Sequence, residues 1–149
     1  MNWTGNKSVR LSQICVAVFA VLLLALDGCC YWAVGAFIRL RNMHWQSGVL
    51  MMLTIYLCSV FGWLLLIKLW RLLRNIQRGL VFEEENITLL RAVSWCCVGA
   101  CVICLASTLY YLPFLAVSIA AGFMALIVRI VKNVFQQAIT MKSELDFTV

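Results

Sequence analysis

The sequence predicts an all-α fold, a bundle of four transmembrane helices, and three observations support this prediction. Apolar residues make up 64% of the 149 residues and charged residues only 12%, whereas soluble domains average about 45–50% and about 25%. The apolar residues form long runs, and the charged residues lie between these runs. A single proline and eight glycines exclude a collagen-like or disordered chain. The whole chain, 1–149, is therefore predicted to be one integral membrane domain.

Four apolar runs reach the length of a membrane span. They cover about residues 11–38, 48–67, 92–112 and 113–134. A hydrocarbon core of roughly 30 Å requires about 20 helical residues. The fourth run reaches this length because it includes Arg129, whose long side chain can extend to the lipid headgroups. Pro113 is expected in a tight turn between the third and fourth spans, since proline is tolerated in the first turn of a helix.

The first run is predicted to be a permanent span and not a cleaved signal peptide. Lys7 and Arg10 precede an apolar stretch, as in the first part of a signal peptide. The apolar run continues through Tyr31, Trp32 and Phe37, whereas the apolar part of a signal peptide is short.

Basic residues gather on one side of the predicted spans. Ten of the twelve lysines and arginines lie in the N-terminal tail, between the second and third spans, or from Arg129 onward, at the end of the fourth span and after it. The other face has only Arg39 and Arg41. Because cytoplasmic segments carry the excess of Lys and Arg, we expect a multi-pass protein of the cell membrane with both termini in the cytoplasm.

Helical periodicity continues past the spans on this basic side. Apolar residues recur at spacings of three and four in two segments: Leu69, Leu73, Ile76 and Leu80; and Val131, Val134 or Phe135, Ala138, Met141 and Leu145. Between them, Leu89, Leu90, Val93 and Cys97 lead into the third span. Gly79 is expected to end the second helix, and Glu83, Glu84 and Glu85 suit the first turn of the third. Helices two to four are therefore predicted to extend into a short cytoplasmic stalk, where their apolar stripes pack together.

The stalk and tail provide the candidate contacts with a partner: Arg71, Arg74, Arg78, Phe82, Glu84, Asn86, Lys142, Glu144 and Asp146. The basic stripe has two interpretations, contact with anionic headgroups or docking of a cytoplasmic protein. Direct nucleic-acid binding is not expected, because no recognition module accompanies the charge. The lipid bilayer and a cytoplasmic regulatory protein are thus the expected partners, and no cofactor is predicted.

Two cytoplasmic segments resemble a bacterial family of small membrane proteins of unknown function, DUF2975. The tail from Ala138 to Val149 resembles the family's ending, which typically reads Lys-x-Glu-Asn-Asp-Leu/Phe-Thr-Val/Ile. The loop Gly79–Asn86 is similar to a second family pattern. The chain departs from the family at Leu145, where Asn is usual, and at Glu83, where Ser or Thr is frequent. Glu83 caps a helix less well than a short hydroxyl side chain.

The resemblance implies a function class but no chemistry. The family has no established catalytic residues to carry over to this chain. Its members are often encoded beside a small helix-turn-helix regulator of transcription. This association implies a membrane partner or antagonist of a DNA-binding protein.

Eight cysteines occur in the sequence, and three of them share a helix face. Cys97, Cys101 and Cys104 are spaced i, i+4, i+7. Thiolates at this spacing could hold a soft metal such as Cu(I) or exchange electrons. A redox pair, however, needs access and a lowered thiol pKa, whereas cysteines within a span also act as small buried apolar residues. Packing is the favoured interpretation, with a metal or thiol redox site as the remote alternative.

Asp27 is the one acidic residue inside a predicted span. A charge there costs at least about 2.5–3.5 kcal/mol. The expected compensation is neutralisation or a hydrogen bond to an inward hydroxyl, with Arg129 as an ion-pair alternative. The hydroxyl candidates are Thr54, Ser107, Thr108 and Ser118. Asp27 is also the centre of the alternative function, a small proton- or cation-coupled transporter or channel subunit.

No combination of residues in the sequence indicates an enzyme. His44 is the single histidine, and it is expected in an exposed outer loop. Ser/His/Asp, paired-carboxylate and HExxH motifs are absent from the sequence. A non-enzymatic regulatory or interaction protein is therefore the first hypothesis.

Overall fold

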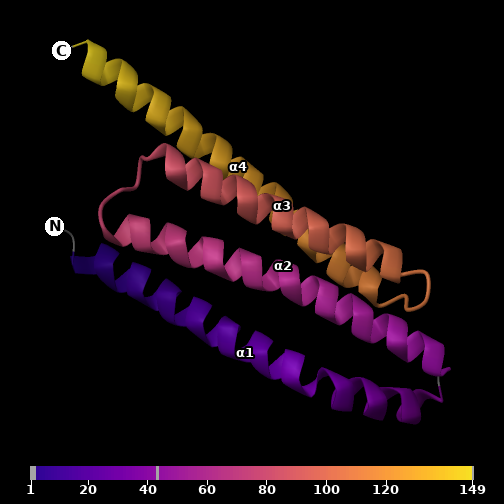
Figure 1. The fold of residues 1–149 in the computed structure, drawn as a ribbon. Coiled ribbons are helices and arrows are strands. Elements are labelled where there is room, and N and C mark those ends of the chain that lie inside the picture. The colour runs from indigo at the N-terminus through magenta and orange to yellow at the C-terminus, as the bar shows by residue number, and fades with distance from the viewer. Residues whose placement is uncertain (1–2, 43, 149) are drawn as a thin grey trace.

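The computed structural model describes residues 3–42 and 44–148, which form four long helices (Figure 1). They are α1 (Trp3–Arg41), α2 (Trp45–Gln77), α3 (Glu84–Ser107) and α4 (Phe114–Phe147). No strand occurs among the described residues. All four helices are long and apolar enough to cross a membrane. The predicted all-α, four-span fold is confirmed, and the chain is a multi-pass membrane protein.

The helices differ in length from the apolar runs. With 34 residues, α4 is about 50 Å long at 1.5 Å per residue, which exceeds a hydrocarbon core of roughly 30 Å. Helix α1 begins at Trp3, so the N-terminal tail is helical too and the extension is not limited to helices two to four. The predicted third span reached residue 112, but α3 ends at Ser107.

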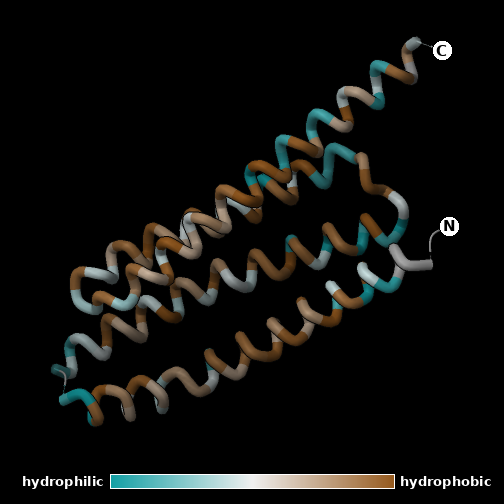
Figure 2. Tube along the Cα trace, turned by 180° about the vertical axis from the view of Figure 1, so that it is seen from behind, coloured by the Kyte–Doolittle hydropathy of each residue, from teal (hydrophilic) through white to brown (hydrophobic). Residues whose placement is uncertain are grey.

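The four helices form an open, antiparallel row. Among the four described helices, packing joins only those that follow one another in the chain, α1 with α2, α2 with α3, and α3 with α4. Helix α1 also reaches the α3–α4 connection, where the Phe37 ring lies 5.7 Å from that of Tyr111. Both views show α1 separated from the α3–α4 pair by α2 (Figures 1 and 2). The row is thus open at α1 and at α4, and most side chains of α1 are exposed.

The N-terminus, the α2–α3 loop and the C-terminus lie at the same end of the molecule (Figure 1). The α1–α2 and α3–α4 connections lie at the other end. Figure 2 shows hydrophobic segments along the central part of all four helices, with hydrophilic residues gathered towards the ends. The two groups of basic residues found in the sequence are therefore at opposite ends of the row. We refer to the end with the termini as the basic end.

A small apolar core joins α2, α3 and α4 near the basic end. Leu72, Leu89 and Leu90 are buried together, and the partly buried Leu69, Ile76, Val128 and Phe135 pack against them. The predicted packing of apolar stripes is therefore present up to the level of Phe135. It does not continue along α4, because α2 ends at Gln77 and α3 begins at Glu84. The last turns of α4 project beyond the loop without a covering helix (Figure 1).

Gly79 ends α2, as predicted from the sequence. Its φ is +80°, in the left-handed region that glycine adopts without a side-chain clash. Its N–H donates to the Ile76 carbonyl at 3.0 Å, and the Leu80 N–H donates to the Asn75 carbonyl at 3.0 Å. These two bonds form a Schellman motif. At the start of α3, Glu83 makes no side-chain capping bond, in agreement with the expectation that it caps poorly.

Candidate functional site

Asp27 lies in the interface between α1 and α2, with its carboxylate held by two donors. Its Oδ2 accepts a hydrogen bond from Ser59 Oγ at 2.7 Å and another from Trp63 Nε1 at 3.0 Å. Tyr56 Oη donates to the Asp27 carbonyl oxygen at 3.3 Å. The expected contact with an inward hydroxyl is therefore present, and the hydroxyl belongs to Ser59. Ser59 is buried, with an exposed fraction of 6%. The site is a polar cluster between two helices, in which the Asp27 and Trp63 side chains are half-buried.

The partners named from the sequence are wrong. They were Thr54, Ser107, Thr108, Ser118 and Arg129. Thr54 bonds to Ser107 at 2.8 Å, which links α2 to α3, and Ser118 donates to the Cys101 carbonyl at 3.0 Å. The physical reason is the open row: of the other helices, α1 packs only against α2, so hydroxyls and cations on α3 and α4 cannot reach Asp27.

A signal for the true partners was present in the sequence. Ser59 and Trp63 are spaced i, i+4, so they lie on one face of α2. Both carry a polar hydrogen on an otherwise apolar run, and a search for polar pairs at helical spacing would have found them.

One oxygen of the Asp27 carboxylate is left without a partner. Asp27 Oδ1 is buried and accepts no hydrogen bond from the described residues. A buried polar atom without a partner is costly in an apolar environment. Chemically, this oxygen can take up a proton or contact a small cation, while Oδ2 remains fixed by Ser59 and Trp63.

Two of the three cysteines on the predicted face contact different helices. Cys104 Sγ lies 3.6 Å from Cys58 Sγ on α2, whereas Cys101 Sγ lies 3.4 Å from Ser118 Oγ on α4. Cys97 is buried. Helix α3 lies between α2 and α4, so a stripe along it serves two interfaces. No group of three or more His, Cys, Asp or Glu side chains that could hold a metal ion occurs among the described residues.

Asn86 was predicted as a partner contact, and this prediction is wrong because the side chain is buried. Its exposed fraction is 0%. Its Nδ2 donates to the Leu80 carbonyl at 2.7 Å and to the Val81 carbonyl at 2.9 Å. Its Oδ1 accepts a bond from Asn75 Nδ2 at 3.1 Å. Asn86 therefore fixes the α2–α3 loop onto the start of α3.

Phe82 also has a structural role. Its ring centroid lies 6.5 Å from that of Phe135 on α4, although nearly half of the side chain, 48%, is exposed. The loop is thus attached to α4 as well as to α3.

The remaining contact candidates whose side chains are described are exposed, and they lie in three separate places. Arg71 and Arg74 line an apolar groove of about 380 Å³ between α1 and α2, and Arg78 and Glu84 flank the α2–α3 loop. Lys142 and Glu144 are exposed on the projecting part of α4. The side chain of Asp146 and the terminal Val149 lie outside the described residues.

Comparison with known proteins gives one match. A family model described as "Protein of unknown function (DUF2975)" matches residues 6–149. No curated protein and no solved structure matches the chain.

Proposed function

We propose that this chain, which belongs to the DUF2975 family of proteins of unknown function, is a non-enzymatic regulatory membrane protein that binds a cytoplasmic protein through the end of α4. The protein lies in the cell membrane with both termini in the cytoplasm. Supporting this orientation, the basic residues gather at the end of the molecule that holds both termini, in line with the positive-inside rule.

The observation that carries this proposal is the uncovered end of α4. The last turns of α4, which ends at Phe147, project beyond the α2–α3 loop (Figure 1). Met141 is 58% exposed, Leu145 69% and Phe147 92%. Met141 and Leu145 are spaced i, i+4, so they share one helix face. We call Met141 and Leu145 the tail face.

A helix with an apolar face outside the hydrocarbon core suits one mode of recognition, in which an amphipathic helix lies in an apolar groove of its partner. Lys142 and Glu144 flank the tail face with charges of both signs, as expected of a polar rim. The family resemblance supplies the partner class, a small helix-turn-helix regulator. Its binding to the membrane protein would hold the regulator away from DNA.

Photo-crosslinking in cells tests this proposal. A photoreactive amino acid at Met141 or Leu145 should crosslink to a soluble protein with the mass of the helix-turn-helix regulator. The same group at Phe123, which is 63% exposed within the apolar part of α4, should crosslink only to lipid. Crosslinks from the tail face that lead only to lipid or to a second copy of the chain would contradict the proposal.

Substitutions on the tail face extend this prediction. The double variant Met141→Glu/Leu145→Glu should bind the regulator at least about a hundredfold more weakly, since each buried apolar side chain contributes roughly 1.5–3 kcal/mol. The matched control Gln136→Glu/Gln137→Glu adds the same charge to exposed positions of α4 and should bind normally.

A second candidate function is supported by the unpartnered Asp27 Oδ1. An intramembrane carboxylate with a free oxygen suits a proton- or cation-coupled transporter or channel subunit. If the protein is such a transporter or channel subunit, proteoliposomes should show a proton flux above that of protein-free liposomes. The flux should fall to background in Asp27→Asn, which keeps the shape of the side chain but cannot carry the charge. It should persist in Thr88→Ala, a control at an exposed position on α3. Equal flux in wild type and Asp27→Asn, or no flux in wild type, would remove this candidate.

A further inference from the structure

A hollow with three basic side chains lies between α3 and α4 near the basic end. Its volume is about 270 Å³. Helix α3 contributes Arg91, Ser94, Trp95 and Val98, and helix α4 contributes Arg129 and Lys132. None of these lining residues is acidic. The hollow therefore gathers positive charge that no carboxylate of its own lining neutralises.

The register of the two helices sets the depth of each side chain. Ser94 Oγ donates to the Ala125 carbonyl at 3.2 Å, so these two residues lie at the same level. Because the helices are antiparallel, Arg91 and Arg129 lie about one turn nearer the basic end. Lys132 lies further in that direction, and Trp95 and Val98 lie towards the middle of the membrane.

The hollow thus changes from cationic to apolar with depth. Lys132, Arg91 and Arg129 form its outer part, Ser94 and Trp95 its middle, and Val98 its inner part. A phospholipid has the same order, with a phosphate, then a glycerol and ester region, then an acyl chain. Guanidinium groups bind phosphate oxygens in pairs, and tryptophan is enriched at the level of the headgroups.

We propose that this hollow binds the phosphate of an anionic phospholipid from the leaflet at the basic end. The cations contact the phosphate, Trp95 packs along the glycerol region, and one acyl chain follows Val98. Basic pockets between transmembrane helices on the cytoplasmic side are suited to anionic headgroups. A free phosphate ion shares the headgroup chemistry, but it would leave the apolar inner part of the hollow unfilled.

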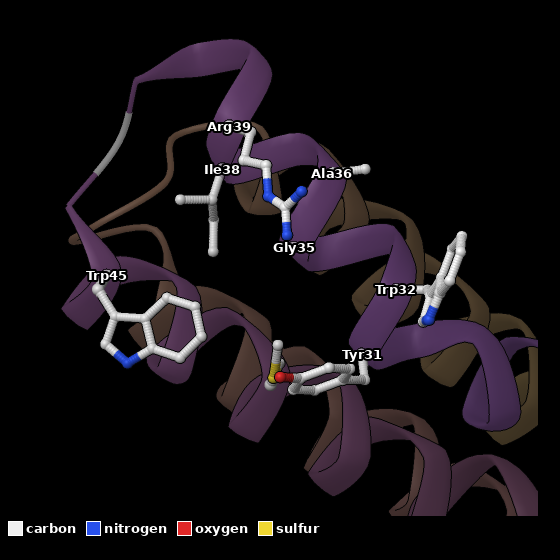
Figure 3. A pocket seen from close by; sticks show the side chains of 8 residues that line it. Tyr31, Trp32, Gly35, Ala36, Ile38, Arg39 and Trp45 are labelled. Carbon is white, nitrogen blue, oxygen red and sulfur yellow. The ribbon is translucent and has the colours of Figure 1, made fainter.

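The hollow at the opposite end of the molecule provides a contrast. It is larger, about 360 Å³, and it lies between α1 and α2. Figure 3 shows a single guanidinium there, that of Arg39, among Tyr31, Trp32 and Trp45. One cation among aromatic rings is the usual composition of a membrane interface. Clustered positive charge is thus a feature of the α3–α4 hollow and not of every hollow at headgroup level.

Lipid titration of the full-length protein tests this inference. Delipidated protein in a neutral detergent is titrated with phosphatidylglycerol or phosphatidylcholine, and bound lipid is counted by native mass spectrometry. Inorganic phosphate is added as a competitor in a third arm. We expect one phosphatidylglycerol to bind preferentially, and millimolar phosphate not to displace it.

Three variants locate the binding. Arg91→Gln/Arg129→Gln/Lys132→Gln should bind phosphatidylglycerol about a hundredfold more weakly, since each basic side chain near an anionic headgroup contributes roughly fivefold. The control Arg10→Gln/Arg78→Gln/Lys142→Gln removes three exposed charges from the same end and should bind normally. Arg91→Lys/Arg129→Lys keeps the charge but loses the paired guanidinium contacts, so its affinity should lie between those of the wild type and the triple glutamine variant, which separates loss of charge from loss of folding.

Three results would overturn the inference. Equal weakening in the two triple glutamine variants would indicate diffuse surface charge. Equal binding of phosphatidylglycerol and phosphatidylcholine would indicate a site for acyl chains alone. Displacement of the lipid by inorganic phosphate would indicate a site for the free ion.

Discussion

Replacing Asn86 by leucine should lower the free energy of unfolding by about 3 kcal/mol. Leucine has a similar volume but no hydrogen-bonding atoms, so the Leu80 and Val81 carbonyls lose the donor that Asn86 Nδ2 provides. Asn75 Nδ2 also loses its acceptor, Asn86 Oδ1. Leaving a buried polar group unsatisfied costs about 1–3 kcal/mol, and here several groups are affected at once.

The measurement is unfolding of the purified protein in mixed micelles, with hydrogen exchange of the α2–α3 loop as a local readout. Exchange at residues 78–86 should accelerate, because Asn86 fixes this loop. The matched control is Asn133→Leu, the same substitution at an exposed asparagine on α4, with an expected change below about 0.5 kcal/mol. An equal effect of the two substitutions would show that the buried hydrogen bonds do not hold the loop.

Replacing Gly99 by leucine should destabilise the α2–α3 interface by about 1–3 kcal/mol, the usual cost of overpacking. A Cβ atom at Gly99 would lie 2.6 Å from Cε1 and 2.9 Å from Cζ of the Phe61 ring. An aromatic ring is rigid, so it cannot yield as the end of a flexible side chain can. Either the Phe61 ring of α2 must leave its position against α3, or the two helices must separate.

The same unfolding assay measures this effect, and the chain offers a matched control. Nothing lies within 4 Å of a Cβ built at Gly28 on α1, so Gly28→Leu should be tolerated. A cysteine crosslink between α2 and α3, formed through Cys58 and Cys104 at 3.6 Å, should become slower in Gly99→Leu if the helices separate. Unchanged stability and unchanged crosslinking in Gly99→Leu would mean that Phe61 does not fix the spacing of these helices.

The open row affects how the intramembrane aspartate is interpreted. Asp27 meets only two helices, and its donors Ser59 and Trp63 both come from α2. In a closed bundle, a side chain on α1 could also face α3 or α4, which carry the hydroxyls of Ser107 and Ser118. The polar cluster therefore ties the outermost helix of the row to its neighbour, and the unpartnered Oδ1 is the feature that the flux experiment addresses.

Much of the fold could be predicted from the sequence, because the features that determine it depend on short stretches of the chain. Span length depends on hydropathy over about 20 residues, and the four spans follow from it. The end of α2 depends on one glycine, Gly79, whose φ of +80° few other residues adopt easily. The weak cap at Glu83 is likewise a property of a single side chain. Each of these features requires no knowledge of what lies next to it in space.

The roles of single residues at the candidate sites were harder to predict from the sequence. Asn86 belongs to the segment that resembles the family pattern, and its polarity suggested an exposed contact. The structure buries it at 0% exposure, because the chain reverses at Gly79 and brings two loop carbonyls onto its amide group. Polarity in the sequence does not distinguish a side chain that meets a partner from one that satisfies its own backbone.

The sequence by itself determined that this is a four-span membrane protein with its positive charge concentrated at one end. Only the tertiary structure decided that the helices form an open row, that Asp27 faces Ser59 and Trp63, and that Cys58 meets Cys104. The physical reason is that lipid is as apolar as most side chains, so a transmembrane helix shows no clear polar and apolar faces. Helix partners are then chosen by close packing between distant segments, as at Gly99 and Phe61, and this shape complementarity leaves no periodic pattern in the sequence.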